Sequence, residues 1–173
     1  FSALQNSSIS QYSSSNVSKT ETLNTKLPHF QFGELDRATE HFSMSIYDSP
    51  HENDLNNITY LAKGLFKQPV IVKKLKSLHL SGDSFDSLIS RQFKTEVEIM
   101  SKYNHKNILI LLGYSWDGPN YCLVYEYLDG GTLRQNIIKS DELKPLARTN
   151  IAFGIAKGIE YLHNNSVIHG DIK

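Results

Sequence analysis

The apolar residues of this chain follow two different periods, and the change falls at residues 129–131, an Asp-Gly-Gly run. Before this run they gather in short β-branched or aromatic groups that are typical of strands, such as residues 70–72 after Pro69. After it they recur at helical spacing, in a stripe that consists of Ile151, Ile155, Ile159 and Leu162. The chain is therefore expected to form an α+β fold, with a β-rich first half that contains one long helix and a helical second half.

Turn residues divide the two halves into separate elements. In the first half we expect a helix over residues 32–41, strands over 58–61 and 70–72 joined by a turn at 63–68, a loop over 77–90, a helix from about 86 to 103, and strands over 108–113 and 121–127 joined by a turn at 116–120. In the second half we expect a short helix over 132–138 and a longer one over 145–163. Gly154 and Gly158 weaken the longer helix, so we expect it to pack closely against a neighbouring segment.

The first 27 residues differ in composition from the rest of the chain. They are rich in Ser, Asn and Thr, and their apolar residues are isolated, so residues 1–27 are predicted to be a flexible linker and residues 28–173 to be the folded domain. The chain begins with Phe1 and not with Met, which agrees with a fragment of a longer protein that carries another domain before the linker.

Composition argues against several classes of protein. Lys plus Arg and Asp plus Glu both number 18, so the chain lacks the basic excess that nucleic-acid binding needs. The seven His are scattered, and no metal site is predicted. No stretch approaches the roughly 20 apolar residues of a membrane span. Cys122, the single cysteine, is expected to be a small buried hydrophobe, and a chain without an internal disulfide fits the cytoplasm.

Four charged residues follow one another in an order that suits phosphoryl transfer. Lys73 ends a predicted strand, and Glu96 lies 23 residues later on the predicted helix. Asp171 and Lys173 follow the long helix. A lysine fixed by a glutamate can hold phosphate oxygens, an aspartate can orient an acceptor hydroxyl and take its proton, and a second lysine can offset the charge of the transferred group. Each residue alone fits a solvated surface charge equally well; their joint order makes them catalytic candidates.

Several runs resemble the signature set of the protein kinases. They are Val70-Ile71-Val72-Lys73-Lys74, Glu96, Cys122-Leu123-Val124-Tyr125-Glu126-Tyr127-Leu128 and His169-Gly170-Asp171-Ile172-Lys173. More narrowly, residues 32–42 and 105–114 resemble the Pelle/interleukin-1-receptor-associated kinases, nearest to their type-four branch, and plant receptor-like kinases share many of these runs. The resemblance implies a truncated protein-kinase-like fold, with the N-lobe over about residues 28–128 and the start of the C-lobe over 129–173.

This resemblance also implies a function: an ATP- and Mg²⁺-dependent serine/threonine protein kinase in receptor-proximal innate immune signalling of the Toll/interleukin-1 type. Tyr125 would be the gatekeeper, and Glu126 and Leu128 would belong to the hinge whose backbone binds adenine. Val70 and Ile71 would cover the adenine. The implied partners are a protein substrate and adaptor or receptor-complex proteins, the latter recruited through the missing N-terminal domain.

The chain departs from the kinase pattern at three places. Residues 54–59, where a glycine-rich phosphate loop is expected, contain no glycine, and the side chains of Asp54, Asn56 and Thr59 would obstruct the approach of phosphates. Gly170 replaces an arginine that in such kinases binds a phosphorylated activation loop. The chain stops before the family's catalytic-loop Asn and Asp-Phe-Gly metal ligand, so this piece alone is expected to be inactive.

Three functions therefore stay open. The leading one is the signalling kinase. The second is a pseudokinase scaffold, which the missing glycines favour and the four retained charged residues oppose. The third is a small-molecule phosphotransferase of the aminoglycoside or choline type, whose catalytic loop often reads His-Gly-Asp; Lys173 and the hinge-like residues 122–127 oppose it.

Overall fold

A computed structural model describes residues 23–43, 45–47, 57–75, 83–138, 143–170 and 172. Several predicted features lie outside these residues. They are most of the linker, Asp54 and Asn56 of the segment where a phosphate loop was expected, the first part of the loop predicted at 77–90, and the catalytic candidates Asp171 and Lys173.

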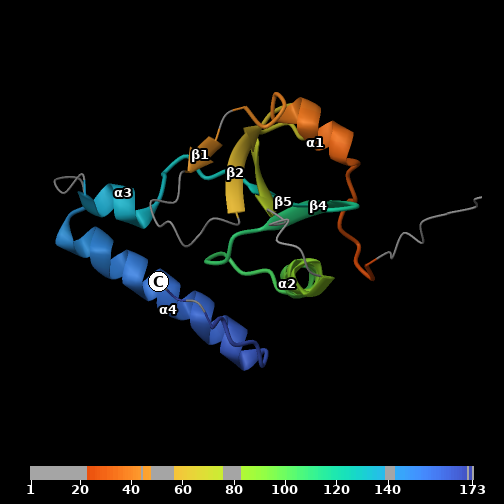
Figure 1. The fold of residues 1–173 in the computed structure, drawn as a ribbon. Helices are drawn as coiled ribbons and strands as arrows, with labels where there is room; N and C mark the ends of the chain where they lie inside the picture. The colour runs from red at the N-terminus through yellow and green to blue at the C-terminus, as the bar shows by residue number, and fades with distance from the viewer. Residues whose placement is uncertain are drawn as a thin grey trace, which may run out of the picture.

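The β-rich half forms a five-stranded antiparallel sheet in the order β1-β2-β3-β5-β4 (Figure 1). The strands are β1 Ser45–Tyr47, β2 Asn57–Ala62, β3 Val70–Leu75, β4 Leu111–Asp117 and β5 Asn120–Glu126. The sequence pattern did not predict β1, which has only three residues and therefore shows no alternation. The strand β3 lies at the centre of the sheet, so its side chains can be covered on both faces.

Within the described residues, four helices accompany the sheet: α1 Phe32–Ala38, α2 Asp83–Lys102, α3 Leu133–Ile138 and α4 Pro145–Asn164. The helices α1 and α2 cover opposite faces of the sheet, and α3 and α4 follow it in the second half of the chain (Figure 1). The predicted α+β arrangement, with a β-rich first half and a helical second half, is confirmed. None of the helices within the described ranges has the length and apolar character needed to cross a membrane.

The helix α2 packs one apolar stripe against the sheet. Ile89, Phe93 and Val97, spaced four residues apart, are at most 5% exposed, and the Phe93 ring lies 5.2 Å from that of Tyr121. The loop predicted over residues 77–90 is wrong from Asp83 onward, because the helix begins there. Ile89, inside the helix predicted from about residue 86, extends the buried stripe by one further turn.

The helix α1 covers the other face of the sheet. Its Leu35 is fully buried together with Val72 and Val124 of β3 and β5. Cys122 lies in the same cluster and is fully buried, as predicted. Burial raises the pKa of its thiol to about 12, so this cysteine is an inert core residue.

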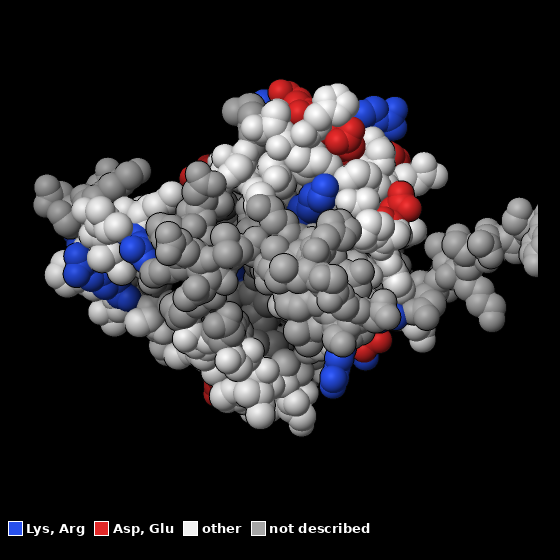
Figure 2. Space-filling view, viewed as in Figure 1, with Lys and Arg blue, Asp and Glu red and all other residues white. Residues whose placement is uncertain are grey.

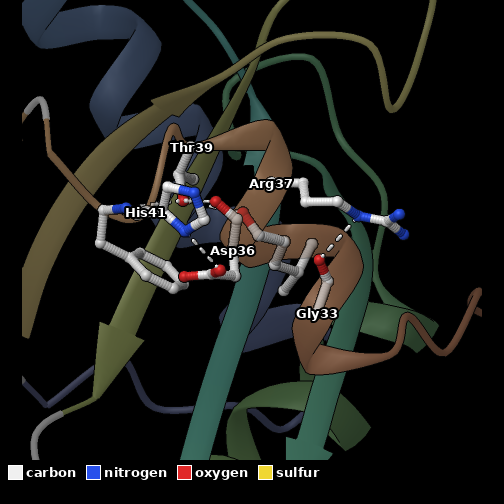
Figure 3. A network of polar contacts seen from close by, with 7 residues as sticks. Gly33, Asp36, Arg37, Thr39 and His41 are labelled. Atoms are coloured by element: carbon white, nitrogen blue, oxygen red, sulfur yellow. Dashed lines mark hydrogen bonds and ion pairs between the residues drawn. The ribbon is translucent and has the colours of Figure 1, made fainter.

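The end of α1 shows why a helix predicted to reach residue 41 stops at Ala38. The Thr39 hydroxyl donates to the Leu35 carbonyl at 2.7 Å and accepts from the Phe42 amide at 3.2 Å. Residues 40–42 then take left-handed backbone angles, with φ between 52° and 58°. The His41 ring contacts the Asp36 carboxylate at 2.7 Å, which holds the reversed turn against the helix (Figure 3). Left-handed angles at three residues other than glycine cost energy and carry no sequence signal.

The first strand of the β4–β5 hairpin begins and ends later in the chain than predicted. The predicted strand 108–113 is observed at Leu111–Asp117, and the predicted turn 116–120 is reduced to Gly118 and Pro119. Trp116 pairs with Tyr121 and Asp117 with Asn120, so residues with turn-forming chemistry extend the ladder instead. The apolar run before the strand is partly solvent-exposed, which explains why hydrophobicity alone placed the strand too early.

The helix α4 packs against the segment that follows α2. A Cβ built on Gly158 would lie 3.0 Å from the Asn107 carbonyl oxygen, and the Tyr161 ring stacks on His105 at 4.9 Å. The close packing predicted from the glycines is therefore confirmed. The predicted buried stripe is only partly correct, because Leu162 is buried whereas Ile155 is 45% exposed.

Among the described residues on the face seen in Figure 2, charged side chains do not gather into one large patch. Over the described part of this face, blue and red atoms stand in small separate groups.

Candidate active site

Lys73 lies on the face of β3 that α2 covers. In the sheet it is directly opposite Thr59 of β2 on one side and Leu123 of β5 on the other. Its neighbour Lys74 points to the other face, where its ammonium lies 4.7 Å and 4.5 Å from the ring centroids of Phe32 and Phe42. Strand alternation therefore gives two adjacent lysines different surroundings, and only Lys73 faces the long helix.

Glu96 of α2 meets Lys73 across this face. The Lys73 Nζ donates to Glu96 Oε1 at 3.1 Å and to Oε2 at 3.4 Å. Glu96 precedes Val97 of the buried stripe, so it lies at the edge of the apolar face and keeps access to water. The two side chains are 26% and 22% exposed. The structure thus brings together the first two catalytic candidates, as the sequence order suggested.

A third side chain joins this pair from β5. The Tyr125 hydroxyl donates a hydrogen bond to Glu96 Oε1. Burial of the Tyr125 phenol raises its pKa far above the usual value, and the neighbouring Glu96 carboxylate raises it further. Tyr125 therefore stays protonated and remains a donor. The Glu96 carboxylate is thus held by Lys73 from β3 and by Tyr125 from β5. The sequence marked Tyr125 as a gatekeeper but gave no sign of this hydrogen bond.

The segment after β5 continues toward the second half of the chain. The Glu126 amide donates to the Ile110 carbonyl at 3.2 Å, and the Glu126 side chain accepts from the Ile110 amide at 2.9 Å. These two bonds fix the end of β5 to the residue before β4. Leu128, two residues later, is 55% exposed and lies beyond the strand.

A cavity of about 320 Å³ opens beside this segment. It is lined by Ile46, Tyr127, Asp129, Gly130, Gly131, Gln135 and Asn136, which come from β1, the segment after β5 and the start of α3. Its size is at the lower end of the range for small-molecule sites. Of these residues, the sequence resemblance indicated only Tyr127, which lies inside the hinge expected over residues 126–128. A site made of a short strand and a turn leaves no motif for the others.

Comparison with known proteins agrees with this arrangement. The sequence pattern that defines the family described as protein tyrosine and serine/threonine kinase matches residues 55–173. This chain belongs to that protein kinase family.

The most similar relatives include plant receptor-like kinases. Cysteine-rich receptor-like protein kinase 26 of Arabidopsis thaliana is 34% identical over 170 residues, which cover 92% of this chain and 24% of that protein. Serine/threonine-protein kinase VIK of the same plant is 36% identical over 135 residues, covering 72% of the chain and 30% of that protein. Receptor-like kinase TMK2, also from this plant, is 37% identical over 112 residues, which cover 60% of this chain and 12% of that protein. The chain thus spans less than a third of the length of these kinases.

The end of the kinase chain is described only in part. Asp171 and Lys173 lie outside the described residues. Gly170, which precedes them, has a φ of +74°, a left-handed angle that glycine adopts without strain. The backbone angle thus gives a reason for glycine at the position where many kinases carry arginine.

Two further predicted site residues of this kinase chain differ in their placement. Ile71 lies on the same face of β3 as Lys73 and belongs to the cluster under α2. Val70 belongs to the cluster under α1, on the opposite face, and is 2% exposed. The structure therefore brings Ile71, but not Val70, to the face of the candidate site. In the described part of the chain, no three His, Cys, Asp or Glu side chains form a group that could hold a metal ion.

Proposed function

We propose that the full-length protein is a serine/threonine protein kinase and that Lys73 and Glu96 form its phosphate clamp. The observation that carries the proposal is the ion pair between β3 and α2, at 3.1 Å, on the sheet face next to the segment that follows β5. An isolated surface pair would be weakly held. Here the Tyr125 hydroxyl also binds the carboxylate, so the lysine ammonium is held at a fixed position.

Each remaining residue has one task in this proposal. Asp171 orients the substrate hydroxyl and accepts its proton, and Lys173 offsets the charge of the phosphoryl group. The backbone of Glu126 and Leu128 holds the nucleotide base beside the cavity at Tyr127 and Asp129. When bound, Mg·ATP supplies the transferable phosphoryl group. The Lys73–Glu96 pair fits triphosphate oxygens, because the ammonium is partly exposed and is already oriented by a carboxylate.

The finer assignment rests on sequence resemblance. The runs at residues 32–42 and 105–114 support a Pelle/interleukin-1-receptor-associated type of kinase in the cytoplasm. The names of the plant relatives support work close to a receptor. We therefore propose receptor-proximal signalling through a protein substrate and an adaptor or receptor partner. The Toll/interleukin-1 and innate immune context is proposed from the resemblance of the chain itself.

The test is transfer of phosphate from Mg·ATP to a generic protein acceptor by the full-length protein. Lys73→Met removes the ammonium that holds the phosphates, and Asp171→Asn removes the base, so each substitution should lower the rate by at least about a hundredfold. Equal rates for the wild type and both variants would overturn the proposal.

A pseudokinase scaffold is the second candidate. The absence of glycine from residues 54–59 favours it, because side chains in a phosphate loop would obstruct the approach of phosphates to the backbone. A folded full-length protein that neither transfers phosphate nor binds Mg·ADP in a thermal-shift titration would select the scaffold over the enzyme.

A further inference from the structure

Ile71 lies between the two ends of the proposed nucleotide site. On the face of the sheet that carries Lys73, it is directly opposite Leu61 of β2 and Tyr125 of β5. Lys73 lies two residues further along the same strand, at a distance of about 7 Å. The segment at Glu126 begins one residue after Tyr125. A ligand that reaches from this segment to the Lys73 ammonium must therefore pass over Ile71.

This position is occupied by a large and stiff side chain. Ile71 is 8% exposed and packs in the cluster under α2, together with Tyr125 and Leu123. Its branched Cβ restricts χ1, so the side chain cannot easily turn aside. The family signature has alanine at this position, two residues before the lysine. The chain therefore carries three additional side-chain carbons where a flat base has to lie.

The cavity beside the segment after β5 agrees with this obstruction. Its described lining residues come from β1, the segment after β5 and α3, and among them none belongs to β2 or β3. The open space of about 320 Å³ thus lies at one end of the site and does not include Ile71 or Lys73.

We propose that Ile71 is a size-selecting residue, which narrows the base slot and makes the binding of adenine nucleotides weak. This inference rests on the proposed function, because it assumes that Lys73 holds the phosphates. Two features of the chain could weaken nucleotide binding: the Ile71 side chain in the base slot and the missing glycines of the phosphate loop. The proposal concerns the first of these. The two causes predict different results for a ligand without phosphates.

The test measures the dissociation constants of adenosine and of ADP by isothermal titration with the full-length protein. Ile71→Ala should lower both constants by at least about tenfold, because the misfit of an overfilled slot is removed. The matched control is Val72→Ala. Val72 is fully buried on the opposite face of the same strand, so its truncation weakens the fold without opening the slot and should leave both constants unchanged.

Ile71→Val serves as a second variant that keeps the β-branched shape needed by the strand. It should give a smaller gain, about threefold, and it decides the question if circular dichroism shows that Ile71→Ala does not fold. Unchanged constants in the folded Ile71 variants would overturn the size-selecting role while leaving the kinase proposal intact.

Adding Lys73→Met to Ile71→Ala separates the two proposals. If Ile71 selects by size and Lys73 holds phosphates, the double variant should keep the gain for adenosine and lose affinity for ADP. A gain for adenosine with unchanged ADP affinity would support Ile71 and contradict the clamp. Failure of every variant to bind either ligand would overturn both.

Discussion

At the scale of single residues, the centre of the site is the Glu96 carboxylate. It accepts from the Lys73 ammonium on β3 and from the Tyr125 hydroxyl on β5. Sequence order predicted the first of these contacts, since a lysine at the end of a strand and a glutamate on the next helix are a recognisable pair. The second contact could not be predicted, because it depends on the register between β3 and β5. That register places Tyr125 opposite Ile71, two residues from Lys73.

Cys122 gives a prediction for pH dependence. Burial raises its pKa from 9.0 to about 12, so the folded state keeps the thiol proton at pH values where the unfolded chain loses it. The free energy of unfolding should therefore fall as the pH rises from 9 toward 12, by up to about 1.4 kcal/mol per pH unit.

The measurement is urea denaturation of the wild type and of Cys122→Ala between pH 8.5 and about 10. Tyrosines, with a pKa of about 10, also begin to ionise in this range, but their contribution is common to the two proteins. The variant should be less stable throughout, and its stability should depend less on pH. A slope in the variant that equals that of the wild type would show that the thiol is not the titrating group.

At the scale of secondary-structure elements, packing predicted from glycine spacing can be tested on α4. A Cβ on Gly158 would meet the Asn107 carbonyl oxygen at 3.0 Å, a backbone atom that cannot turn aside. Gly158→Ala should therefore lower the free energy of unfolding by about 1–3 kcal/mol in urea titrations, although alanine is the better helix former.

Gly33 is the matched control, because it also lies in a helix and a Cβ there would have no atom within 4 Å. Gly33→Ala should leave the stability unchanged or raise it by up to about 1 kcal/mol. If both substitutions stabilise the protein, α4 does not pack against the Asn107 segment as described.

Elements could be predicted where one apolar period controls them. The four-residue spacing of Phe93 and Val97 located α2, and the β-branched run of β3 located the central strand. Prediction failed where backbone geometry decides the boundary. The helix α1 ends at Ala38 because the Thr39 hydroxyl and the left-handed residues after it form a compact turn. The hairpin shifted because Trp116 and Asp117 pair across it although their neighbours favour a turn.

At the scale of the whole molecule, the two faces of the sheet carry different kinds of residues. The face under α1 holds an apolar cluster and the Lys74 ammonium between two aromatic rings. The face under α2 holds Lys73, Glu96 and Ile71. The sequence order suggested the pairing of Lys73 with Glu96, while the other two candidates, Asp171 and Lys173, lie in the second half of the chain and outside the described residues. The sequence could not assign Val70 to the face under α1, because the residues of a fully buried strand are apolar on both faces and show no alternation.

Because Lys73 and Lys74 lie on opposite faces of the same strand, comparing them tests most directly whether Lys73, and not its neighbour, holds the phosphates. The measurement is the rate of phosphate transfer from Mg·ATP by the full-length protein as wild type, Lys73→Met and Lys74→Met. Both variants lose one positive charge from the same strand. Lys73→Met should lower the rate by at least about a hundredfold. Lys74→Met should leave the rate within about twofold and cost only about 0.5–1 kcal/mol of stability, from the lost contacts with the two rings. Equal losses of rate in the two variants, or no loss in either, would contradict the role of Lys73 in holding the phosphates.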